Sequence, residues 1–244
     1  MTANRLVAVF EKMAKHERSG GGAAALCVVA ADVMNVSGAV VALAPTSGPL
    51  TRFCSSNDVA QALLELEITL GEGPFTQSTH SNEAVELSSL SGADPLPWPG
   101  YVVAAEELGA RAVFAFPLSL GAIRLGALGL YHDEPGPLSE DQAVDGSLLA
   151  SVVARALLAM LAGAPEGELS AVLSRESTLD FTLHQASGMV AVQGSMSVAD
   201  AQVTLRARAF STGDSLADTV KSVITRRLYF DQVTRTWLET TGEP

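Results

Sequence analysis

The 244-residue sequence has few of the residues that build metal or redox sites. It contains two cysteines, Cys27 and Cys54, and four histidines, and neither type falls at the spacing of metal ligands. We interpret the cysteines as two buried thiols, because unpaired cysteine packs as a small apolar residue. The sequence therefore predicts neither a metal ion nor another cofactor.

Motifs of catalysis are also missing from the sequence. There is no serine in a nucleophile-elbow motif, no phosphate-binding loop and no dinucleotide-binding fingerprint. The alternating strand–helix pattern of a phospho-receiver domain is absent as well. We therefore expect a protein that is not an enzyme.

Long apolar runs are absent too. No apolar stretch reaches the length of a membrane-spanning helix, and the N-terminal residues lack the apolar core and cleavage site of a secretory signal. Hydrophobic residues still make up 48% of the chain, which is enough for real cores. We expect a folded cytoplasmic protein with no membrane partner.

Positive charge is scarce overall but unevenly distributed. The net charge of −12 argues against nonspecific binding along nucleic-acid backbones. Counted by segment, residues 1–163 carry eight Lys/Arg against 17 Asp/Glu, residues 164–180 one against four, and residues 231–244 one against three. Residues 181–230 reverse the balance, with five Lys/Arg against three Asp/Glu. This segment is the one suited to an anionic partner.

Turning to what is present, the first 163 residues mix helical and strand-like patterns. We expect Ser139 to be the N-cap of the last helix, without a capping box. The order predicts an α+β domain in which helices flank an antiparallel sheet. The expected helices are 3–17, 23–34, 58–66, 101–108 and 139–161, and the expected strands are 39–43, 50–54, 84–87, 112–118 and 123–131.

Residues 183–228 have the pattern of three helices. Ser197 and Ser215 are each followed three positions later by an aspartate, which is typical of a helix start. Apolar residues recur at helical spacing behind both, so the helices are expected to close on one small core. The core positions expected are Val198, Ala201, Leu205, Ala209, Leu216, Val220, Val223 and Ile224.

A stripe of apolar residues connects the two regions. Pro165 is expected to interrupt the helices, because proline lacks a backbone N–H. The spacing beyond it, alternating between three and four, favours a dimer seam, although an ordinary buried helix face remains the alternative. The stripe consists of Leu169, Val172, Glu176, Leu179, Leu183, Ala186 and Val190.

Residues 183–228 also resemble an ANTAR domain, a three-helix RNA-binding module of bacterial transcription antitermination regulators. Many ANTAR domains have a lysine where this chain has Ser187. The motifs that carry the resemblance are His184-Gln185-Ala186-Ser187-Gly188-Met189-Val190, Ser197-Val198-x-Asp200-Ala201, Leu205-Arg206-Ala207 and Gly213-x-Ser215-Leu216-x-Asp218.

The first part of the chain resembles a GAF domain of the kind that precedes ANTAR domains in such regulators. GAF domains sense very diverse ligands, and no residue here transfers as a known ligand contact. The motifs are Leu70-Gly71-Glu72-Gly73-Pro74, Trp98-Pro99, Leu108-Gly109-Ala110-Arg111-Ala112, Phe116-Pro117-Leu118, Ile123-Arg124-Leu125-Gly126 and Gly136-Pro137-Leu138-Ser139.

The two resemblances divide the chain into four parts. Residues 1–163 are expected to form a GAF-like sensor or dimerisation domain, and 164–180 a coiled-coil-like connector helix. Residues 181–230 would form the ANTAR-like RNA-binding module, and 231–244 an acidic tail. GAF–ANTAR proteins are generally dimeric, which implies a homodimer here.

The implied function is transcription antitermination through binding of paired stem-loops in mRNA leaders, which disfavours a terminator hairpin. The alternative is a small-molecule-sensing GAF protein whose C-terminal helices bind a protein partner and not RNA. Cations near a helix C-terminus, such as Lys221 and Arg226, also have a purely structural explanation in the helix dipole. The candidate RNA-binding residues are His184, Gln185, Ser187, Gly188, Met189, Gln193, Arg206, Arg208, Lys221 and Arg226.

Overall fold

The computed structural model describes residues 24–45, 48–91, 97–163 and 168–240, with backbone alone at 24–25, 159–163 and 168–180. The chain divides into two compact units, a first that ends at Pro165 and a second that begins at Glu166. The helix expected at residues 3–17 and the break expected at Pro165 lie outside the described residues. Among the residues described, no helix has both the length and the apolarity needed to cross a membrane.

A five-stranded antiparallel sheet forms the centre of the first unit, in the order β2-β1-β5-β4-β3. All six residues of β1 are buried, as expected for an inner strand that is covered on both faces. The α+β architecture with an antiparallel sheet is confirmed, because each strand lies close to its expected range. The bounds are β1 Gly38–Leu43, β2 Thr51–Ser55, β3 Val85–Leu87, β4 Ala112–Leu120 and β5 Ile123–His132.

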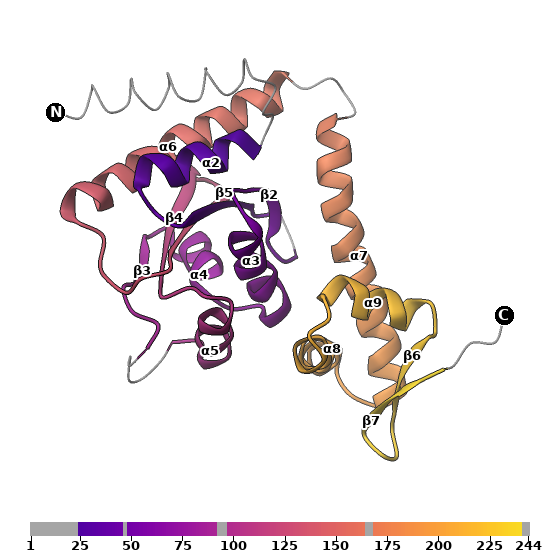
Figure 1. The fold of residues 1–244 in the computed structure, drawn as a ribbon. Helices are drawn as coiled ribbons and strands as arrows, with labels where there is room; N and C mark the ends of the chain where they lie inside the picture. Colours follow the sequence, from indigo (N-terminus) through magenta and orange to yellow (C-terminus); the bar gives the residue numbers. More distant parts are fainter. Residues whose placement is uncertain (1–23, 46–47, 92–96, 164–167, 241–244) are drawn as a thin grey trace. The chain divides into compact units, whose positions relative to one another are not determined.

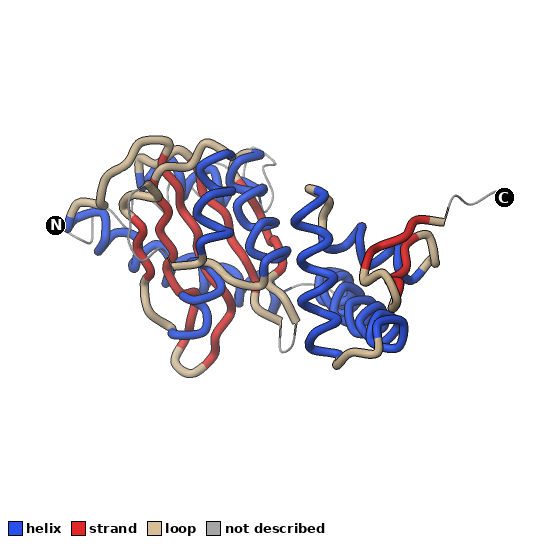
Figure 2. Tube along the Cα trace, turned by 90° about the horizontal axis from the view of Figure 1, so that it is seen from below, coloured by secondary structure: helices blue, strands red, loops and turns tan. Residues whose placement is uncertain are grey.

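Helices cover both faces of this sheet (Figure 1). α2 (Ala24–Met34) and α6 (Glu140–Gly163) lie side by side on one face. α3 (Asp58–Leu70) and α4 (Pro74–Ser81) cover the other face, and α5 (Pro99–Glu107) lies beyond them. In Figure 2 the strands run as a twisted layer behind the helices of one face. The sheet is therefore enclosed as the middle layer of three.

Alternation along the strands divides the core between the two faces. Phe114 and Phe116 of β4 point into the cluster that α2 and α6 close. On the opposite face, the ring of Phe75 reaches β5 at Gly129, where an added Cβ would come within 2.4 Å of that ring. Because Gly129 has no side chain, the Phe75 ring of α4 can pack directly against β5 at this position.

The N-terminus of α6 contains a complete capping box. The Gln142 backbone N–H donates to Ser139 Oγ at 3.2 Å, and the Ser139 N–H donates to Gln142 Oε1 at 3.0 Å. Ser139 is therefore the N-cap, as expected. The expectation that it lacks a capping box is wrong, because glutamine at the third position supplies the reciprocal acceptor.

Cys27 of α2 and Cys54 of β2 form a disulfide, with their Cα atoms 6.0 Å apart. The expectation of two separate buried thiols is wrong. The two cysteines are 27 residues apart in the sequence. They come together because α2 packs on the sheet beside β2. The bond joins this helix to an edge strand.

The second unit consists of three helices followed by an antiparallel hairpin. The helices are α7 (Glu168–Gly194), α8 (Val198–Thr212) and α9 (Leu216–Ile224), and the hairpin is β6 (Leu228–Asp231) and β7 (Thr236–Glu239). The three expected helices are present. The hairpin takes the place of the first part of the expected acidic tail, so residues 231–239 are structured.

Both predicted helix starts in this unit are confirmed. Ser197 Oγ accepts the Asp200 N–H at 3.1 Å, and Ser215 Oγ accepts the Asp218 N–H at 3.1 Å. Each bond satisfies one of the backbone donors that a helix leaves unpaired in its first turn.

One hydrophobic core holds the second unit together. Val198 is an exception among the expected core residues, since its side chain is 48% exposed. The buried residues are Leu183, Ala186, Val190, Ala201, Leu205, Ala209, Leu216, Val220, Val223, Leu228 and Phe230.

This core corrects the interpretation of the connector stripe. Leu183, Ala186 and Val190 pack against α8 and α9 of the same chain. They cannot also form a dimer seam, so for these three positions the alternative of an ordinary buried helix face is the right one. The side chains of Leu169, Val172, Glu176 and Leu179 lie outside the described residues.

Candidate nucleic-acid interface

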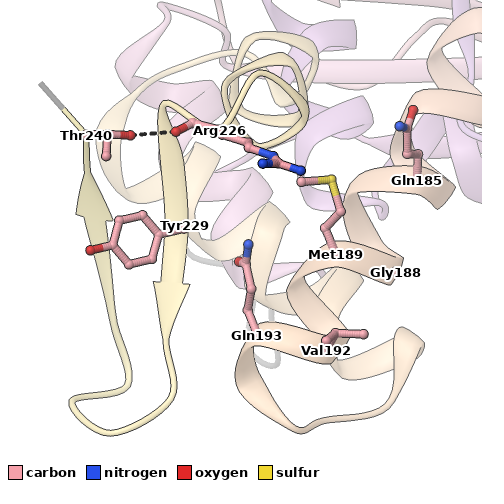
Figure 3. Close-up of a pocket in the computed structure, with 8 residues that line it drawn as sticks. All are labelled: Gln185, Gly188, Met189, Val192, Gln193, Arg226, Tyr229 and Thr240. Atoms are coloured by element: carbon pink, nitrogen blue, oxygen red, sulfur yellow. Dashed lines mark hydrogen bonds between the residues drawn. The ribbon is translucent and has the colours of Figure 1, made fainter. Parts of the chain in front are cut away.

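A pocket of about 770 Å³ opens in the second unit between α7 and the segment that runs from the end of α9 through the hairpin (Figure 3). Five of its residues come from α7, and three come from the C-terminal segment. The pocket is lined by Gln185, Gly188, Met189, Val192, Gln193, Arg226, Tyr229 and Thr240.

The α7 wall follows from helical periodicity. The pocket residues of α7 follow Gln185 by three, four, seven and eight positions, which places them along one side of the helix. They are Gly188, Met189, Val192 and Gln193. Ala186 and Val190, which are interleaved with them, are buried in the hydrophobic core, and Met189 packs against its edge. The same helix therefore holds the module together with one face and lines the pocket with the other.

Gly188 leaves a gap in the middle of this wall. A Cβ atom built at this position meets nothing within 4 Å. Glycine inside a helix costs about 1 kcal/mol relative to alanine, and packing within the described residues gives no reason for that cost. The backbone at Gly188 is consequently open to the close approach of a ligand.

Arg226 reaches the pocket from a strained backbone position. The Arg227 N–H donates to the Ser222 carbonyl at 2.9 Å and the Arg226 N–H to the Val223 carbonyl at 3.0 Å, which is the Schellman arrangement at the end of α9. Arg226 itself has φ +59°, a left-handed conformation that favours glycine. α8 ends in the same way with Gly213 at φ +72°. An arginine at such a position costs about 1 kcal/mol, and its guanidinium points across the pocket toward Met189 (Figure 3).

Several hydrogen bonds hold the hairpin wall in place. Gln193 Oε1 accepts the Phe230 N–H at 3.0 Å, which joins β6 to α7. The Thr240 hydroxyl donates to the Arg226 carbonyl at 2.5 Å, which joins the end of the hairpin to its beginning. Arg208 of α8 forms an ion pair with Glu239 at 2.8 Å. The pocket is thus framed by bonds within the module.

The structure distributes the ten candidate RNA-binding residues over three environments. Gln185, Gly188, Met189, Gln193 and Arg226 are brought together in the pocket. Ser187 is fully buried, and its hydroxyl donates to the Leu183 carbonyl at 2.6 Å, so its proposal as an RNA contact is wrong. The rest are not among the residues that line the pocket, and Arg208 is held in its ion pair: His184, Arg206, Arg208 and Lys221.

Three pocket residues were not among the candidates. Val192 continues the helical face of Gln185 and Gly188, so the helical periodicity was a usable signal for it. Tyr229 lies at the end of the expected RNA-binding module and Thr240 in the expected acidic tail, and neither belongs to one of the three expected helices. The alternation of apolar residues at Leu228 and Phe230 is the sequence signal for that strand.

The first unit contains an unusual polar group of its own, the buried carboxylate of Glu67. Its two oxygens accept the N–H groups of Phe75 and Thr76 at 2.9 and 2.8 Å, at the N-terminus of α4. Burial raises the pKa of Glu67 from 4.5 to about 8, against the lowering effect of these two donors. Burial, and secondarily the charge of Glu67, raises the pKa of Tyr101, whose hydroxyl has no hydrogen-bond partner among the described residues.

The raised pKa of Glu67 makes the free energy of unfolding depend on pH. Because the pKa of Glu67 is higher in the folded than in the unfolded chain, the folded state loses stability as the pH rises from about 4.5 to about 8. The slope is at most about 1.4 kcal/mol per pH unit. Glu67→Gln should flatten it in urea unfolding measured across this range, and Glu65→Gln, on the exposed face of α3, should leave it unchanged. A wild-type stability independent of pH would contradict the assignment.

Metal chemistry receives no support from the described residues. They contain no group of three or more histidine, cysteine, aspartate or glutamate side chains placed to hold an ion.

No protein-family model and no curated protein matches the sequence. Solved structures similar to it include GAF domains. The GAF domain of a phosphoenolpyruvate-protein phosphotransferase from Acinetobacter is 15% identical, with 68% of this chain and 99% of that chain covered and a TM-score of 0.48. The corresponding domain from Coxiella burnetii is 14% identical, with 66% and 98% covered and a TM-score of 0.47. The GAF domain of the cyanobacteriochrome TePixJ is 15% identical, with 55% and 86% covered and a TM-score of 0.44.

Proposed function

We propose that this chain is an RNA-binding regulator of transcription antitermination whose C-terminal module binds hairpin loops in nascent mRNA. The observation that carries the proposal is the gathering of five candidate RNA contacts in one open pocket, namely Gln185, Gly188, Met189, Gln193 and Arg226. The resemblance of residues 183–228 to ANTAR domains supports it independently of the geometry.

The chemistry of the pocket fits a loop better than a duplex. Bases in a loop are unstacked and expose their edges, whereas a duplex presents mainly phosphates and ribose hydroxyls. The amides of Gln185 and Gln193 can bond base edges, and the guanidinium of Arg226 can bond phosphate. A protein occupying stem-loops in this way would stabilise them against a competing terminator hairpin.

The first unit is proposed to act as the sensor. Its resemblance to GAF domains and its enclosed antiparallel sheet support this role, with an unknown small molecule as effector. Dimerisation is proposed through the N-terminal part of the connector stripe, at Leu169, Val172 and Leu179, because these positions have the spacing of a coiled-coil seam. Two copies would then hold paired stem-loops.

Replacing Arg226 with glycine tests the proposed function without unfolding the module. Glycine removes the guanidinium and also relieves the left-handed strain, so stability should stay within about 1 kcal/mol of wild type. Affinity for a hairpin RNA should fall about 5- to 30-fold, and the slope of log affinity against log salt should decrease by about one. Gel-shift titration at two salt concentrations, with thermal unfolding beside it, measures all three quantities.

Arg235→Gly is the matched control. Arg235 has φ +53° in the β6–β7 turn, so this variant also removes one exposed arginine and one left-handed strain. It lies outside the pocket and should bind RNA like wild type. Equal losses in the two variants would indicate nonspecific attraction. Failure of the wild-type chain to prefer a hairpin over a duplex of the same stem would favour the protein-partner alternative.

A further inference from the structure

The orientation of Tyr229 is determined by the hairpin. Leu228 and Phe230 are buried in the module core, and side chains alternate along a strand, so Tyr229 faces the other way. Phe230 also packs edge-on against Trp237, with ring centroids 5.3 Å apart and planes at 76°. These contacts hold the strand against the core, so Tyr229 lies on the outer face of the hairpin, 37% exposed.

Across the pocket from Tyr229 stands the wall of α7 (Figure 3). The side chain of Met189 and the bare backbone at Gly188 line this side, and nothing lies within 4 Å of a Cβ at Gly188. In Figure 3 the Tyr229 ring extends from β6 toward β7, so a flat group that stacks on the exposed face of this ring would turn its edge, and not its face, toward the thioether and open backbone of α7.

Gln193 supplies a polar group of fixed orientation between these walls. Because its Oε1 accepts the Phe230 N–H, the amide cannot rotate to exchange its oxygen and nitrogen. Its nitrogen is consequently directed into the pocket, where Figure 3 shows it above the helix. The pocket thus offers a hydrogen-bond donor to the edge of a planar ligand.

We infer that this pocket holds one unstacked nucleobase of an RNA loop, stacked on Tyr229 with an acceptor atom of its edge bonded to Gln193. Arg226 lies at the same pocket, where it can bind the phosphate of that nucleotide. The inference rests on the proposed function and adds that the β6–β7 hairpin binds RNA through Tyr229. Stacking on an aromatic side chain tolerates any base, so the position in the loop matters more than its identity.

The experiment combines variants of the full chain with RNAs that lack single bases. The probe is the tightest binder from a pool of hairpin RNAs that share one stem and carry randomised loops. Each loop nucleotide is replaced in turn by an abasic one. Wild type should lose about 5- to 100-fold in affinity at one loop position. Tyr229→Leu should lose as much on the intact RNA and show no further loss on that abasic RNA, whereas Tyr229→Phe should keep wild-type behaviour.

Gly188→Leu keeps the inference testable even if Tyr229→Leu unfolds. A leucine at that position has open space around its Cβ and fills the pocket from the opposite wall, so sensitivity to the abasic position should disappear while the melting temperature is maintained. If wild type binds hairpins but tolerates every abasic loop, or if both variants keep the abasic sensitivity, the base pocket is refuted and RNA binding stands. If no hairpin in the pool binds above the level of its duplex stem, the proposed function itself fails.

Discussion

Replacing Leu183 with lysine is expected to unfold the C-terminal module. Leu183 is 3% exposed and packs in the core that α7 shares with α8 and α9. Shortening such a leucine to alanine alone costs about 2–5 kcal/mol, and a buried unpaired ammonium adds to that cost. Circular dichroism and thermal unfolding should show the loss of the module's helices, while the sheet of the first unit remains.

Phe181→Lys is the matched control for this variant. Phe181 lies on the same helix two residues earlier, but 71% of its side chain is exposed. The same change of an apolar residue to lysine should therefore cost less than about 0.5 kcal/mol there. If Leu183→Lys left the melting temperature unchanged and merely reduced the mass in light scattering, Leu183 would belong to a dimer seam and our core assignment would be wrong.

Reduction of the Cys27–Cys54 disulfide should destabilise the first unit by about 3 kcal/mol. The bond closes a loop of 27 residues, and opening it restores conformational freedom to the unfolded chain. Urea unfolding of the wild type with and without reductant should show the difference as a lower midpoint. Both sulfur atoms are buried, so complete reduction requires the denatured chain or a strong reductant.

The double variant Cys27→Ala, Cys54→Ala is the control for reduction. Its unfolding midpoint should not respond to reductant, and its stability should equal that of the reduced wild type to within the cost of the lost side-chain volume. An intact mass of the native wild type that corresponds to two free thiols would contradict the bond.

Elements with strong periodicity could be predicted from the sequence, and elements determined by tertiary contacts could not. Local sequence patterns predict the strands near Val40 and Leu128. They also predict the helix starts at Ser197 and Ser215, where the capping hydrogen bonds agree with the pattern. The helix α4 has no apolar periodicity of its own. It forms where Glu67, seven residues before Pro74, accepts its first N–H groups. A contact of that kind becomes visible only in the folded chain.

The candidate site was predictable in part for a similar reason. Gln185, Gly188 and Met189 share a helix, so one face of α7 could be inferred from spacing alone. Ser187 lies on the opposite face and is buried beside Ala186, a residue of the core that α7 shares with α8 and α9. Tyr229 and Thr240 enter the pocket through a hairpin whose pairing no short-range pattern specified.

The bond between Thr240 and the Arg226 carbonyl has a practical consequence for protein engineering. The Thr240 N–H also donates to the Arg227 carbonyl at 2.9 Å, so the end of the hairpin is fastened at the rim of the pocket. A fragment cut at residue 235 would keep all three helices yet lose β7 and this fastening. Purification tags, labels and fusion partners therefore belong at the other end of the chain, and a minimal module has to extend through residue 240.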